Sequence, residues 1–256
     1  LKPHAIFWPI MLKTMGLPVY QHLNVHGYWN VEGRKISKSL GNMISPIAMK
    51  ELYGFDAFRY FLLREMVFGL DSNFSEAALI RRINGDLANN LGNLVSRTLN
   101  MTARFAGGAV PKPGELGDLE REIQAAAPET AARVDRLIRS YEFHRALEAI
   151  FEFLDRVNRY LETRAPWKAA KDPANADRVA TTLYTSCQAL RAIALLLAPF
   201  LPETAQEIVD RLGIPDALKA ARLPDDAGRW GVLEPGTATT KGAALFPRVE
   251  VPEEAD

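Results

Sequence analysis

The chain has 256 residues, of which 48% are apolar, and its 31 basic side chains balance its 31 acidic ones. A chain of this length and apolar content can bury one sizeable core or two modest ones, and usual domain sizes favour two units. The zero net charge argues against a protein that coats nucleic acid through bulk charge, so a nucleic-acid site would need a local cluster of basic residues.

The first part of the chain predicts the end of an α/β domain. Its apolar spacing, strand-forming residues and turn residues indicate three elements: a helix over 4–15, a strand over 19–26, and a hairpin of 27–31 with 34–37. The hairpin turn is placed at Glu32-Gly33. One helix, one strand and one hairpin cannot enclose a core, so this segment is expected to complete a domain whose beginning is missing.

The centre of the chain predicts an α-helical bundle, which makes the fold mainly α. Residues 56–67 have helical spacing, and residues 68–74 break it with Gly, Asp and Asn. Over residues 75–104 the apolar side chains keep a period near 3.6 behind an N-cap at Ser75, which predicts one long amphipathic helix. Further helices, bounded by Pro and Gly, are predicted over 119–126, 130–164, 175–198 and 202–212. Together these helices indicate an antiparallel bundle.

The chain after residue 214 becomes rich in Gly, Pro and Asp, which predicts an irregular tail that packs back on the bundle. Its acidic end, residues 251–256, is expected to fray. The predicted organisation is therefore 1–74 as the end of the α/β domain, 75–214 as the bundle, and 215–256 as the tail.

A short basic run follows the predicted hairpin turn. Two lysines and two hydroxyls lie within the five residues Lys35-Ile36-Ser37-Lys38-Ser39. Such a loop offers positive charge and hydrogen-bond donors to a polyphosphate, and nearby glycines allow close backbone approach. Taken alone, a run of this kind is more often a solvated basic turn, so its context has to decide.

That context resembles the class I aminoacyl-tRNA synthetases. Residues 35–39 are similar to their KMSKS signature, with Ile36 in place of Met, and the Leu-Gly-Asn that follows also matches. The runs at 4–9, 68–75 and 86–94 resemble the methionyl-tRNA synthetase family in particular. The resemblance implies that the chain holds the C-terminal remnant of a Rossmann-type catalytic domain followed by an anticodon-binding bundle.

The resemblance also implies roles at the basic run. Lys35 and Lys38 would stabilise the charge that develops on pyrophosphate as it leaves ATP, and Ser37 would bind phosphate or fix the loop. His26, at the end of the predicted strand, would lie near the adenosine, although a structural role is as compatible with the pattern.

His4 and Trp8 stand four residues apart and therefore share one face of the predicted helix. Alone, the pair would suggest a core aromatic beside a satisfied histidine. By resemblance, Trp8 forms an apolar wall for the thioether of methionine and His4 a polar contact.

Asn93 and Arg97 share a face of the long predicted helix, and Trp167 follows a break at Ala-Pro much later in the chain. Hydrogen-bonding side chains and an aromatic platform are what unstacked RNA bases require. By resemblance these three residues read the CAU anticodon. A surface Asn, a salt-bridged Arg and a Trp that caps the bundle would be the structural alternative. Basic residues that could contact nearby phosphates are Arg164, Lys168 and Lys171.

The implied partners are methionine, ATP as its Mg²⁺ complex, tRNA(Met) and the missing N-terminal catalytic half. The single cysteine, Cys187, and the interruption of the longest apolar stretch by Pro199 predict a cytoplasmic setting without a membrane span, disulfide or thiolate metal site. The chain alone is expected to be catalytically inactive. The alternatives are another aliphatic class I synthetase and a non-catalytic tRNA-binding module.

Overall fold

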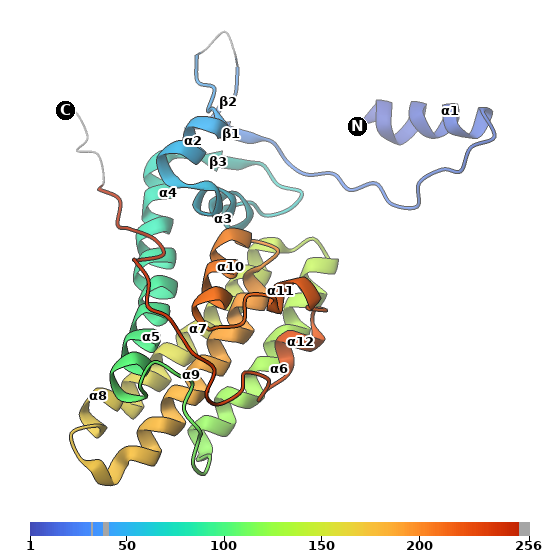
Figure 1. Cartoon of the computed structure of the whole chain (residues 1–256). Helices are drawn as coiled ribbons and strands as arrows, with labels where there is room; N and C mark the ends of the chain where they lie inside the picture. Colours follow the sequence, from blue (N-terminus) through green and yellow to red (C-terminus); the bar gives the residue numbers. More distant parts are fainter. Residues whose placement is uncertain (32, 38–40, 251–256) are drawn as a thin grey trace.

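The computed structural model describes residues 1–31, 33–37 and 41–250. Figure 1 shows a helical bundle with a small sheet and two short helices at one end, and an N-terminal helix that stands apart from both. The mainly α fold predicted from the sequence is confirmed. Among the described residues, no helix is both long enough and apolar enough to cross a membrane.

The N-terminal segment is a helix followed by extended chain. A π-helical turn, η1 (Pro3–Phe7), continues into α1 (Trp8–Thr14), which confirms the predicted helix. The strand predicted over 19–26 is wrong, because these residues lie outside every described strand. A strand requires a neighbour to satisfy its backbone groups, and this stretch has no ladder partner among the described residues.

The small sheet contains three short strands in the order β2-β1-β3. β1 (Trp29–Val31) and β2 (Arg34–Lys35) form the predicted antiparallel hairpin. β3 (Ser72–Phe74) pairs with β1 in parallel. This third strand lies where the sequence predicted only a break, because three residues are too few to show a periodicity.

Two helices cover the sheet. The predicted helix over 56–67 is α3 (Phe55–Glu65), which ends before Val67. The sequence analysis missed α2 (Pro46–Tyr53), whose N-cap is Ser45: its hydroxyl accepts a hydrogen bond from the backbone N–H of Ala48 at 3.3 Å.

The long helix predicted behind Ser75 is continuous but changes its winding. The Ser75 hydroxyl caps it by accepting from the N–H of Ala78. The helix consists of α4 (Glu76–Arg82), a π-helical segment η3 (Ile83–Gly92) and α5 (Asn93–Phe105). The π segment was not predicted.

Four further long helices complete the bundle: α6 (Asp118–Arg139), α7 (Phe143–Arg164), α9 (Ala176–Leu197) and α10 (Pro202–Arg211). The break predicted at 127–129 is wrong, because α6 continues through Pro128. Proline removes one helical hydrogen bond, and the packing of α6 against α7 and α9 outweighs that loss. The chain instead turns at residues 140–142. Two short helices join α7 to α9: α8 (Pro166–Ala169) and η4 (Pro173–Asn175).

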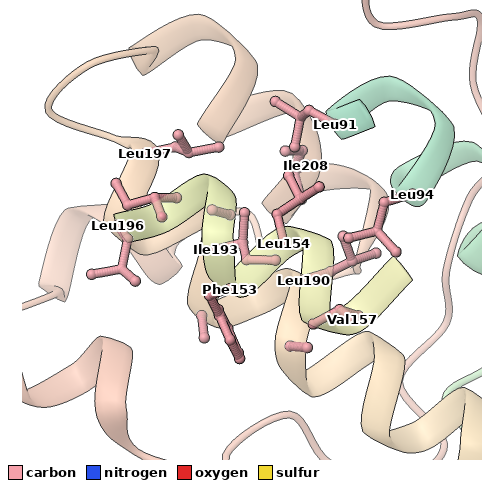
Figure 2. Packing of buried hydrophobic residues seen from close by; sticks show 14 of the residues in the cluster. Leu91, Leu94, Phe153, Leu154, Val157, Leu190, Ile193, Leu196, Leu197 and Ile208 are labelled. Carbon is pink, nitrogen blue, oxygen red and sulfur yellow. The ribbon is translucent and has the colours of Figure 1, made fainter. Parts of the chain in front are cut away.

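The core lies where the long helices meet. Figure 2 shows leucines of the long helix, Leu91 and Leu94, facing Leu154 of α7 and Leu190 of α9. All four side chains are fully buried. Full burial of such a side chain contributes roughly 1.5 to 3 kcal/mol, so these contacts make a large contribution to the stability of the bundle.

The tail contains α11 (Ala217–Ala220) and α12 (Asp225–Gly228) and then runs back along the long helix (Figure 1). Leu233 is buried, and its backbone is bound at both polar groups by the Gln188 amide. Further along, the backbone of Val249 makes two hydrogen bonds of 2.8 and 2.9 Å with the Asn84 amide. The tail is thus attached to the bundle near its middle and close to its end.

Candidate functional site

The predicted site residues fall into two regions, the hairpin with its basic loop and the far end of the bundle. At the hairpin, one side chain closes the base of the loop. The Asn42 carboxamide accepts from the N–H of Ser37 at 2.9 Å and donates to the carbonyl of Lys35 at 3.2 Å. Lys38 lies outside the described residues. Asn42 was not among the predicted site residues, although its place after the Leu-Gly of the matched run was a usable signal.

Lys35 ends β2 with an exposed side chain. Its Nζ lies 5.9 Å from the centroid of the Tyr28 ring, within the range of a cation–π contact. The hairpin that carries Lys35 is fastened to β3, because the N–H of Gly33 donates to Asn73 at 2.7 Å. Lys35 therefore projects from an anchored support into solvent.

His26 is exposed just before the hairpin. Its Nδ1 lies 2.7 Å from the carbonyl oxygen of the adjacent Gly27, a local contact. Gly27 itself is packed so tightly that an added Cβ would lie 2.0 Å from the Leu70 carbonyl oxygen. Only glycine fits there, and the position of His26 follows from that contact.

His4 and Trp8 lie on the helix that stands apart from the hairpin in Figure 1. Both are exposed, and Trp8 retains 49% of its accessible surface. The carbonyl of His4 accepts a hydrogen bond from the Tyr20 hydroxyl. The structure therefore does not bring these two residues to the basic loop.

Arg97 and Trp167 are brought together from distant parts of the chain. The Arg97 guanidinium carbon lies 5.0 Å from the centroid of the Trp167 ring, and Arg97 Nη2 forms an ion pair of 2.7 Å with Glu162. Asn93 is exposed one helical turn earlier on α5. The result is a partly exposed surface with an aromatic ring, a cation, a carboxylate and an amide.

The turn between α7 and α8 places the tryptophan. Ala165 has φ of +42° in the left-handed region, and Pro166 then begins α8. A non-glycine residue in this conformation costs roughly 1 to 2 kcal/mol. The buried ring of Pro166 holds the turn and directs Trp167 towards α5.

Arg164, a predicted phosphate contact, forms an ion pair within the bundle. Its guanidinium pairs with both carboxylate oxygens of the buried Glu120, which also accepts from the Tyr160 hydroxyl at 2.7 Å. Burial by itself would raise the pKa of Glu120, but the hydrogen bonds from Arg164 and Tyr160 outweigh it and lower the pKa. Lys168 and Lys171 are exposed and remain candidates.

A hollow of about 660 Å³ lies beside α11 and α12 and is lined by residues such as Arg191 and Leu233. The predicted site residues do not line it. Among the described residues, no group of three or more His, Cys, Asp or Glu side chains is arranged to hold a metal ion.

Comparison with known proteins matches two family models. Residues 1–99 match "tRNA synthetases class I (M)", and residues 120–245 match the anticodon-binding domain of tRNA ligases. The methionine–tRNA ligases of Deinococcus radiodurans and Fusobacterium nucleatum are 43% and 38% identical over 251 residues, 98% of this chain. That alignment spans 36% and 39% of those relatives, so the chain covers well under half of their length.

A solved structure of Mycobacterium tuberculosis methionyl-tRNA synthetase in complex with methionyl-adenylate has the same fold. It superposes with a TM-score of 0.89 at 40% identity and covers 96% of this chain and 48% of the relative. The first family model includes the basic loop together with Asn93 and Arg97, and the second includes Trp167. The chain therefore belongs to the methionyl-tRNA synthetase family of class I tRNA synthetases.

Proposed function

We propose that this chain is the part of a cytoplasmic methionine–tRNA ligase that carries the catalytic basic loop and reads the anticodon. In the complete protein, the carboxylate of methionine attacks the α-phosphorus of ATP, which is bound as its Mg²⁺ complex. Pyrophosphate leaves, and the methionyl group then passes from methionyl-adenylate to tRNA(Met) as AMP is released. The methionyl-adenylate bound to the M. tuberculosis relative supports this chemistry.

The basic loop acts on the phosphates in this proposal. Lys35 and Lys38 stabilise the charge of the departing pyrophosphate, and Ser37 donates to a phosphate oxygen or fixes the loop. The Asn42 bridge between Lys35 and Ser37 supports such a role, because it sets the width of the loop at its base. His26 faces the adenosine, while His4 and Trp8 line the methionine pocket once the N-terminal catalytic half covers them.

Recognition of the anticodon rests on the contact between Arg97 and Trp167, which is the observation that carries the proposal. A base can stack on the indole while Arg97 and Asn93 donate hydrogen bonds to its edge. The exposed, charged rim of this surface suits RNA better than an apolar protein partner.

The decisive experiment measures binding of a CAU anticodon stem-loop to the 256-residue chain. Trp167→Ala should weaken binding by roughly 1 to 3 kcal/mol, and Trp167→Phe should retain part of it. Trp230→Ala is the matched control, because Trp230 packs beside α12 away from α5. Arg97→Gln should reduce discrimination against stem-loops with altered anticodons. Equal binding by all folded variants would contradict the assignment.

Catalysis is tested separately by ATP–pyrophosphate exchange in a complete ligase that contains this chain. Methionine should support exchange and isoleucine or valine should not. This result would distinguish a methionine–tRNA ligase from a synthetase for another aliphatic amino acid. The 256-residue chain alone should be inactive while still binding the stem-loop. Pyrophosphate exchange by the isolated chain would refute the proposal that catalysis requires the N-terminal catalytic half.

A further inference from the structure

An aromatic cluster joins the bundle to the loop that precedes β3. Tyr141, in the turn between α6 and α7, stacks on Phe68 with ring centroids 5.3 Å apart and planes inclined by 25°. Phe143, at the start of α7, meets both rings edge-on at 6.3 and 6.1 Å. Such geometries are the favourable ones for aromatic pairs, so the cluster forms a specific contact between parts of the chain more than 70 residues apart.

Tyr141 adopts a backbone conformation that needs support. Its φ is +60°, in the left-handed region that tyrosine rarely occupies. The residue is also not a core residue, because 40% of its surface is exposed. Its hydroxyl accepts a hydrogen bond of 2.8 Å from the Asn24 amide. A strained turn thus presents one ring to two segments of the N-terminal part.

Those two segments lead directly to the hairpin. Three residues after Asn24, Gly27 packs against the Leu70 carbonyl with no room for a side chain. The N–H of Tyr28 donates to Asp71 at 2.8 Å. The loop that begins at Phe68 therefore contacts the chain at the start of the hairpin, and it holds the hairpin that carries Lys35.

We infer that Tyr141 is a positioning residue, a latch that fixes the loop 68–74, and through it the hairpin with the basic loop, relative to the bundle. The stack on Phe68 sets the position of the loop, and the hydrogen bond from Asn24 sets that of the chain entering the hairpin. The link to catalysis and RNA rests on the proposed function, whereas the latch itself is a property of this chain.

Hydrogen exchange on the 256-residue chain tests the latch without RNA. Tyr141→Ala should accelerate amide exchange in β1 and β3 about three- to tenfold, because loss of the stack makes local opening easier. Tyr141→Phe retains the stack but loses the hydroxyl that accepts from Asn24. It should therefore restore the protection of β3 and, like Asn24→Ala, leave β1 less protected. Arg139→Ala is the matched control: it removes an exposed ion pair near the same turn and should change neither strand.

The outcomes are separable. Unchanged exchange in β1 and β3 of Tyr141→Ala would overturn the latch. If Tyr141→Ala also exposes α9, the fold as a whole has weakened, and Asn24→Ala then decides, since it removes only one hydrogen bond. In a final arm, a bound CAU stem-loop should increase protection of β3 in the wild-type chain and not in Tyr141→Ala. Failure of the stem-loop to bind would contradict the proposed function and leave the RNA-free test of the latch standing.

Discussion

The N-terminal 28 residues and the helical bundle contain similar kinds of apolar side chain and bury them very differently. In the bundle, Leu154 and Leu190 are completely buried. In η1, α1 and the chain after them, Phe7, Trp8 and Leu17 retain 47% to 56% of their surface. Of the large apolar side chains described as exposed, nineteen precede residue 71 and three follow it. The difference shows that apolar content predicts a core only where the chain also supplies the opposing surface.

The largest effect expected from this comparison is on stability, measured with the same substitution in both regions. Leu154→Ala should lower the free energy of unfolding by about 2 to 5 kcal/mol, because it leaves a cavity between α7 and α9. Leu17→Ala, at a position with 47% exposure, should change it by less than about 0.5 kcal/mol. Urea denaturation of the two variants measures both values. Similar losses of stability in the two variants would mean that Leu17 is buried in solution against a surface that it does not contact in this structure.

A second prediction concerns the buried polar cluster of the bundle. The pKa of Glu120 is lowered in the folded state, so its stabilisation is present above the unfolded-state pKa near 4.5 and disappears as the pH falls through the lower folded value. Glu120→Gln should cost about 2 kcal/mol at pH 7 and should flatten the loss of stability in acid. Asp118→Asn, which alters an exposed pair, should do neither. Chemical denaturation between pH 3 and pH 7 compares the three proteins; parallel curves would rule out the assigned role of Glu120.

The last prediction involves no loss of stability and concerns the rate at which the thiol of the single cysteine, Cys187, reacts with a reagent. Burial raises the pKa of Cys187 to about 11, and its sulfur lies 3.7 Å from the Thr102 hydroxyl. The folded chain should therefore react with a thiol reagent only as fast as it unfolds. Val19→Cys in a Cys187→Ala background, at a position with 41% exposure, should react like a free thiol. Rapid labelling of Cys187 under native conditions would show that the bundle opens more readily than its packing indicates.

The sequence predicted the bundle well because its helices carry their own periodicity. It failed where an element depends on contacts that periodicity does not show. The strand expected over 19–26 needed a ladder partner, and β3 was too short to be recognised. The residues around Pro128 predict a break in the helix, because the contacts that keep Pro128 within α6 are made with other helices.

The candidate site was predictable to a similar degree. The helical spacing placed Asn93 and Arg97 on one face, but only the left-handed turn at Ala165 brings Trp167 to that face. Nothing in the residue pattern around Ala165 predicts a positive φ at an alanine. The ion pairs of Arg97 with Glu162 and of Arg164 with Glu120 likewise depend on tertiary contacts.

The π-helical winding of η3 has a consequence for how this family can tolerate insertions and deletions. Leu79, Ile83, Leu87 and Leu91 recur every fourth residue and are all buried, a spacing that would drift around a regular α-helix. A π-turn holds more residues and rotates the chain by less per residue, which keeps these side chains in line. The same winding sets the angular phase of α5. Loss of one residue from η3 would turn Asn93 and Arg97 by roughly a quarter of a turn away from Trp167. Aligned relatives should therefore place their gaps outside residues 83–97. Frequent gaps within that stretch would show that the orientation of Asn93 and Arg97 relative to Trp167 is not maintained.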